Sequence, residues 1–172
     1  IVQIARPHLE ALAAASEDVV HLGRLDGDQA LYLDKIPGRR RVEISSRIGD
    51  RHPLTSTGLG KALLIDDREA NWRRLFDADQ AAGTHPVVYD GWLERMRGYV
   101  AAGRAFNLEE NEDQIRCVAA SICDASGAIV AASLVACGPG KKGLTDLVAH
   151  GVVHQGVAKA SRFAAEQATQ AQ

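Results

Sequence analysis

One acidic segment has the residue types and spacing that could do chemistry. Asn107-Leu-Glu-Glu-Asn-Glu-Asp113 places four carboxylates within seven residues. Such clusters can bind divalent cations or transfer protons. The segment lacks the alternation of Asp, Asn and Gly that is typical of calcium loops. We therefore expect a polar loop of which one or two members reach a pocket.

Cysteine and histidine chemistry finds less support. Cys117 would be a nucleophile only with a histidine base beside it, and none of the six histidines lies in a recognisable catalytic context. A free cysteine is more often a small buried hydrophobe, so we expect Cys117 to line a cavity. His150 and His154 share a face of an expected helix but lack a third ligand. We expect no catalytic residue, metal site or cofactor.

A Thr/Ser-rich loop feeds a helix at Gly58-Leu59-Gly60-Lys61. The spacing of a phosphate-binding loop is absent, because Ala62 follows Lys61. The free N–H groups at Thr57, Gly58 and Leu59 would still suit a carboxylate. The alternative is that a Thr or Ser side chain caps the helix and no ligand is needed. For the basic run Arg39–Arg41, with Lys35 and Arg47 near, we expect a turn exposed to solvent.

The composition bounds the function classes. The chain has 172 residues, 46% of them hydrophobic and 24% charged, which is ordinary for one globular domain. Twenty Lys and Arg against 22 Asp and Glu leave a net charge of −2, so the chain has no basic field with which to bind nucleic acid by itself. It shows no membrane span and no signal-peptide pattern. Its three cysteines are too few for a disulfide framework, which favours a cytoplasmic location.

Periodicity and turn residues predict the elements that position these groups. We expect a helix over Ile4–Ser16 and a hairpin of Val19–Leu25 and Gln29–Ile36 around Asp26-Gly27. A third extended piece is expected over Arg41–Ile48. Helices follow over Leu59–Ile65 with an N-cap among residues 55–57, around Trp72 with Asp66 or Asp67 as N-cap, and from N-cap Asp90 to Gly103.

The last third of the chain predicts a second hairpin and a helix. Arg116–Cys123 and Ala128–Cys137 flank the turn-rich residues 124–127, and a helix is expected from Thr145. Strands in two clusters separated by helices indicate an α+β fold. We expect one mixed or antiparallel sheet with helices packed on it.

Several of these segments together are similar to the IclR family of bacterial transcriptional regulators. The similarity rests on Arg51–Leu64, on Gly103–Ala120, on the turn 124–127 and on Gly138-Pro139. The opening residues 6–10 and the Asp26-Gly27 hairpin match in position. The resemblance covers essentially the whole chain.

This resemblance implies a single effector-binding domain over residues 1–172, with a GAF-like fold in which helices flank a curved, mainly antiparallel sheet. In the family a winged helix-turn-helix domain precedes it and binds operator DNA as a dimer or tetramer. We expect that domain to be absent from this chain, which starts at Ile1 rather than Met. The expected function is to sense a small organic acid or aromatic catabolite without catalysis. Pure oligomerisation and a Cys117-dependent enzyme remain the alternatives.

By resemblance, the effector pocket lies between the sheet and the Gly58 loop. Its expected lining residues are Thr57, Gly58, Leu59, Asn107, Ile115, Cys117, Leu134, Ala136, Ile44 and His52. Many relatives have two aspartates where this chain has Asn107-Leu108, and a Ser-x-Ser motif in the last strand. We therefore expect a pocket more apolar than usual, with Asn107 and the helix-start N–H groups as its polar anchors.

The register of the last strand leaves two readings open. Counting from the 124–127 turn sets Cys117 opposite Leu134 and selects Leu134 and Ala136 for the pocket. Cys137 is then one extra residue or a bulge. Counting back from Gly138-Pro139 selects Val135 and Cys137 instead. We prefer the first count, because it pairs better with Cys117.

Overall fold

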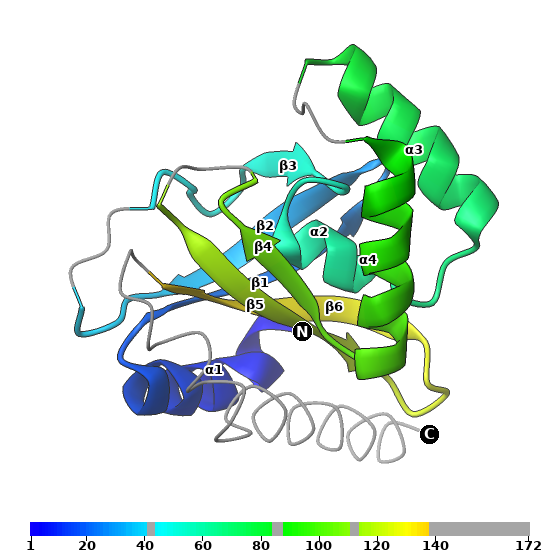
Figure 1. Ribbon diagram of the computed structural model, residues 1–172. Coiled ribbons are helices and arrows are strands. Elements are labelled where there is room, and N and C mark those ends of the chain that lie inside the picture. The colour runs from blue at the N-terminus through cyan, green and yellow to red at the C-terminus, as the bar shows by residue number, and fades with distance from the viewer. Residues whose placement is uncertain (41–43, 84–87, 111–113, 138–172) are drawn as a thin grey trace.

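The computed structural model describes residues 1–40, 44–83, 88–110 and 114–137, and its centre is one curved antiparallel sheet (Figure 1). The sheet has six strands in the order β3-β2-β1-β6-β5-β4. Their bounds are β1 (Val19–Asp26), β2 (Gln29–Ile36), β3 (Arg51–Pro53), β4 (Ala105–Leu108), β5 (Arg116–Cys123) and β6 (Ile129–Cys137). Every neighbouring pair is antiparallel. The α+β, GAF-like architecture expected from the sequence is confirmed.

Helices cover both faces of the sheet. Helix α1 (Val2–Ser16) packs on one face, and α2 (Gly58–Leu63), α3 (Glu69–Ala81) and α4 (Tyr89–Ala102) lie on the other (Figure 1). Each face has its own hydrophobic core, because alternate residues of a strand point to opposite faces. Val118 and Val135 pack with α1, whereas Cys117, Leu134 and Ala136 pack with α2.

The first hairpin forms where the Asp-Gly pair predicted it. Asp26 pairs with Gln29, so the two-residue turn is Gly27-Asp28 rather than the expected Asp26-Gly27, and Gly27 takes the positive φ of 60°. The extended piece expected over residues 41–48 is not confirmed, because residues 44–48 contain no strand. The third strand is β3, which pairs with the start of β2. The edge strand β4 was not expected either.

The register of the second hairpin corrects the sequence count by two residues. Cys117 pairs with Ala136 and Ala119 pairs with Leu134, so the expected pairing of Cys117 with Leu134 is wrong. One residue of the shift comes from the turn, because Cys123 pairs with Ile129. The other is Val130, a bulge that the pairing of Ile122 with Ala131 passes over. Cys137 is no bulge: it pairs regularly with Arg116.

A shift of two residues leaves each side chain on the same face of the sheet. Leu134 and Ala136 therefore still face α2, as the preferred count required, and Val135 and Cys137 belong to the core under α1. The choice between the two readings was right although the register was wrong.

Thr57 caps α2, as the loop-to-helix pattern predicted. Its hydroxyl accepts the N–H of Gly60 at 3.0 Å. The other two predicted N-caps are wrong: α3 starts after Arg68 rather than after Asp66 or Asp67, and α4 starts after Val88, with Asp90 in its first turn. Gly103 ends α4 with a φ of 63°, as predicted.

Some expectations lie outside the described residues. They are the helix from Thr145, its histidines His150 and His154, and the Gly138-Pro139 pair. Within the part of the chain that the structure describes, no helix is long and apolar enough to cross a bilayer.

Candidate functional site

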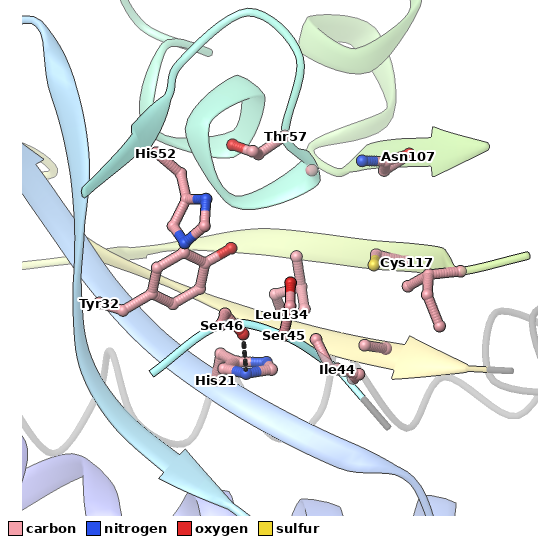
Figure 2. A pocket seen from close by; sticks show the side chains of 13 residues that line it. His21, Tyr32, Ile44, Ser45, Ser46, His52, Thr57, Asn107, Cys117 and Leu134 are labelled. Carbon is pink, nitrogen blue, oxygen red and sulfur yellow. Dashed lines mark hydrogen bonds between the residues drawn. The ribbon is translucent and has the colours of Figure 1, made fainter. Parts of the chain in front are cut away.

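A pocket lies between the sheet and the start of α2, and residues from separate segments line it (Figure 2). Its cavity volume is about 30 Å³, enough for about two ordered waters. A ligand must therefore be small or must displace side chains. The lining residues are His21, Tyr32, Ile44, Ser45, Ser46, His52, Thr57, Gly58, Asn107, Ile115, Cys117, Leu134 and Ala136.

The loop before α2 forms the upper wall and is fixed by hydrogen bonds. The Thr57 hydroxyl donates to the Pro53 carbonyl oxygen at 2.8 Å while it caps Gly60. Asp79 of α3 accepts hydrogen bonds from the backbone N–H and the hydroxyl of Thr55. The indole of Trp92 on α4 donates to the Thr55 carbonyl at 2.8 Å. Helices α3 and α4 thus hold this wall in place.

Gly60 allows the loop to pack closely on α2. A Cβ atom at this position would lie 2.4 Å from the carbonyl oxygen of Leu54, so a side chain has no room. A Cβ atom at Gly58 would lie 3.3 Å from the Leu134 side chain and 3.4 Å from the Asn107 side chain. The absence of a side chain at Gly58 therefore leaves space inside the pocket.

Three neighbouring strands supply one end of the pocket. Asn107 of β4 pairs with Cys117 of β5, which pairs with Ala136 of β6, so one row of side chains crosses the sheet. The Asn107 amide donates to the Ser56 carbonyl at 3.1 Å and accepts the N–H of Glu110 at 2.9 Å. Asn107 thus joins the sheet to the loop before α2.

Four further residues at the other end were not expected from the sequence. His21 of β1 and Tyr32 of β2 point into the pocket with Ser45 and Ser46, which follow the undescribed residues 41–43 (Figure 2). The Ser46 hydroxyl lies 3.0 Å from Nε2 of His21. These side chains make the pocket more polar than the sequence predicted.

Burial keeps the His21 imidazole neutral. It is 2% exposed, and burial, with the positive charge of Lys35 and the His52 side chain, lowers its pKa to about 3. In some enzymes a serine hydroxyl beside an imidazole acts as a nucleophile activated by a base. That chemistry needs a basic histidine oriented by a third group, and Nδ1 of His21 has no hydrogen-bond partner among the described residues. The pair is suited to binding rather than to catalysis.

The acidic segment is used for an ion pair. Glu110 contacts the ammonium group of Lys61, which is 1% exposed, and lies 3.3 Å from Arg95. Burial lowers the pKa of Lys61, and the charge of Glu110 opposes that shift. Among the described residues no three His, Cys, Asp or Glu side chains gather as metal ligands. Of the described residues of the segment, 107–110, Asn107 lines the pocket and Glu110 pairs with Lys61.

All the expected lining residues except Leu59 line this pocket. Leu59 is fully buried, but its side chain packs against Gly23 of β1. Its place one residue into α2 turns it away from the cavity. His21, which interrupts the apolar stretch of β1, is the missed residue that the sequence could have indicated.

Cys117 and the two histidines that line the pocket, His21 and His52, lie at opposite ends of it. Figure 2 shows Cys117 beside Asn107, with His21 and His52 across the cavity near Tyr32. A cysteine nucleophile needs its base within hydrogen-bond reach. The structure does not bring these groups together.

Comparison with known proteins supports the family that the motifs indicated. The family model described as bacterial transcriptional regulator IclR C-terminal matches residues 1–139. The HTH-type transcriptional regulator XynR of Escherichia coli is 31% identical over 133 residues, which cover 76% of this chain and 53% of XynR. KdgR of Dickeya chrysanthemi is 31% identical over 139 residues, which cover 76% of this chain and 44% of KdgR. The chain thus spans about half the length of these relatives.

Solved structures agree in fold. The C-terminal domain of E. coli KdgR superposes with a TM-score of 0.77 and 22% identity, over 95% of this chain and 97% of that domain. This match shows a shared fold, and the family model, which describes the C-terminal part of these regulators, shows which part the chain corresponds to. The chain belongs to the IclR family of bacterial transcriptional regulators and contains their C-terminal domain.

Proposed function

We propose that this domain senses a small organic acid or an aromatic catabolite and modulates operator binding by a regulator. The observation that carries the proposal is the pocket. Segments far apart in the sequence converge on it, and among its described lining residues none is a carboxylate that would repel an acid. Apolar walls with a few convergent polar groups are typical of small-molecule sites.

The two ends of the pocket suit different parts of such a ligand. Thr57 uses its own oxygen atoms for the Gly60 N–H and the first turn of α2. The backbone N–H groups of Gly58 and Leu59 precede those and remain the candidate donors for a carboxylate. An apolar body would then lie along Cys117, Leu134 and Ala136. The self-capping by Thr57 means that the carboxylate would add to the cap rather than replace it.

DNA binding would come from a part of the regulator outside this domain. The relatives are named HTH-type regulators and are about twice as long as the matched region. We propose that a winged helix-turn-helix domain precedes α1, and that the whole acts as a homodimer or homotetramer in the cytoplasm, where the chromosome lies. The effector would change DNA affinity by favouring one assembly geometry over another.

Two alternatives make different predictions. A pure oligomerisation module would bind no small molecule, and its pocket would be filled by side chains on assembly. A Cys117-dependent enzyme would turn over a substrate and lose activity with iodoacetamide. The homologues are regulators rather than enzymes, which favours the sensor.

Thermal unfolding against a panel of aliphatic and aromatic carboxylic acids tests the proposal. A ligand at 100 times its dissociation constant stabilises the folded state by about 2.7 kcal/mol, which a melting shift reveals. Gly58→Val is the control, because its methyl groups would enter the cavity beside Leu134 and Asn107. A shift in the wild type that this variant abolishes supports the sensor. No shift with any acid, or an equal shift in both proteins, contradicts it.

A further inference from the structure

The pocket has a polar end of which the family resemblance implied only His52. His21, Tyr32, Ser46 and His52 surround this end, opposite Asn107 (Figure 2). These side chains come from β1, β2, β3 and the segment that leads from β2 to β3. The Asn107 side chain already bonds to the protein at its end of the pocket, whereas one ring nitrogen of His21 has no partner among the described residues.

The His21–Ser46 pair is buried and incompletely bonded. His21 is 2% exposed and Ser46 is 6% exposed, and Nε2 of His21 forms a hydrogen bond with the Ser46 hydroxyl. Nδ1 of the same ring is buried and has no hydrogen-bond partner in the described parts of the chain. Buried polar atoms are nearly always bonded, so an unpartnered ring nitrogen on a residue that lines a cavity is a candidate contact for a ligand.

Both residues are held in place before any ligand arrives. The Lys35 ammonium donates to the carbonyl oxygens of Ile44 and Ser46 at 2.9 and 2.8 Å. The His21 ring meets the Tyr32 ring edge-on, with 5.2 Å between the ring centres. A group fixed in this way loses little entropy when a ligand binds.

The chemistry of the pair favours an uncharged partner that can both donate and accept. A neutral imidazole has one donor and one acceptor nitrogen, and a serine hydroxyl can act in either role. Which nitrogen of His21 carries the proton decides whether Nδ1 donates or accepts. A ligand hydroxyl fits both cases, because it rotates to suit its partner.

We propose that the His21–Ser46 pair is a hydroxyl-binding subsite, and that the effector is a small hydroxy acid. Its hydroxyl would bond to the ring of His21. This inference rests on the proposed sensor function and narrows its ligand class. His21 is then a specificity-determining residue.

Calorimetric titration of the 172-residue chain with matched acids tests the subsite. The probes are ω-hydroxy acids of three to six carbons and the parent alkanoic acids of the same length. We expect the hydroxy acid of the fitting length to bind about tenfold more tightly than its parent, as one added hydrogen bond to a buried group allows. His21→Phe should bring this ratio to about one, because the hydroxy acid and its parent then meet the same apolar ring.

Ser46→Ala and His8→Phe complete the test. Ser46→Ala also removes half of the pair and should lower the ratio, even if His21→Phe fails to fold. His8→Phe makes the same exchange in α1 and should keep the preference, because His8 is not part of the pocket. Equal binding of both members of every pair, or a preference that survives His21→Phe and Ser46→Ala, overturns the subsite but not the sensor. Absence of binding by every acid overturns the sensor and the subsite with it.

Discussion

The ammonium nitrogen of Lys35 lies 2.8 Å from the carbonyl oxygen of Ser46, and this contact fixes the pocket segment that has no regular secondary structure. The same nitrogen donates to Ile44 at 2.9 Å. One side chain of β2 therefore holds both ends of the Ile44–Ser46 segment, whose three residues all line the pocket.

Lys35→Met removes this anchor and should loosen the segment. Hydrogen bonds from a charged donor contribute about 1.5–3 kcal/mol each, and these are half-buried, so we expect a loss of about 1–3 kcal/mol. Urea unfolding measures it. Arg24→Met is the matched control on the neighbouring strand, since Arg24 is exposed, and should change little. An equal effect of both substitutions would show that Lys35 does not act as an anchor.

The Lys61–Glu110 ion pair should behave differently from pairs on the surface. Lys61 is 1% exposed, so Glu110→Gln leaves a buried ammonium without its counterion. Breaking a buried pair from one side costs about 3–5 kcal/mol. The double variant Lys61→Met with Glu110→Gln should lose less than the single one, because no charge remains buried.

Denaturant unfolding of the single and double variants measures this coupling. Asp77→Asn provides the control, because Asp77 pairs with Arg73 in a bridge whose two side chains are more than half exposed. We expect no measurable loss there. If the losses of stability caused by Lys61→Met and by Glu110→Gln simply add in the double variant, the two side chains do not form a stabilising ion pair.

Local patterns predicted the long elements because their signals lie within the elements themselves. The first hairpin and the Thr57 cap each depend on a few neighbouring residues. The cap was found as expected, and the hairpin formed with its turn one residue later, at Gly27-Asp28. The edge strands β3 and β4 have only three and four residues. Their pairing partners decide that they are strands, and strand partners are not visible in a short segment.

A bulge in β2 brings Tyr32 and Lys35 to the same face of the sheet. Leu22 pairs with Asp34 and Gly23 pairs with Tyr32, which leaves Leu33 without a partner. Tyr32 and Lys35 therefore both serve the pocket although they are three residues apart, whereas regular alternation would place them on opposite faces. The two irregularities in the second hairpin add up to a shift of two residues, which keeps each side chain on its face, so Leu134 and Ala136 were assigned to the right face.

Substitution by alanine should affect stability much more at Gly60 than at Gly58, the other glycine of α2. At Gly60 a Cβ would meet the Leu54 backbone at 2.4 Å, and backbone cannot move aside cheaply. We expect Gly60→Ala to destabilise the fold by about 1–3 kcal/mol or more. At Gly58 the nearest atoms belong to side chains at 3.3 Å and beyond, so Gly58→Ala should stay within about 1 kcal/mol of the wild type. Melting temperatures of both variants decide, and equal destabilisation would refute this packing of the loop on α2.

Acid should destabilise the domain partly through His21. The pKa of its imidazole is about 3 in the folded chain, against an ordinary value of 6.5. Between these pH values the unfolded chain binds one more proton than the folded chain, so this contribution is complete above about pH 6.5 and is lost as the pH falls towards 3. From pH 7 to pH 5 the loss amounts to about 2 kcal/mol.

His21→Phe removes the titrating group, and comparison of its pH dependence with that of the wild type isolates this effect. The other acidic and basic groups remain in both proteins, and any constant change in stability cancels in the difference. Urea unfolding at pH 7 and pH 5 should give a drop that is smaller in the variant by about 2 kcal/mol. An identical drop in both proteins would mean that His21 is not held neutral by burial, and that the polar end of the pocket is open to water.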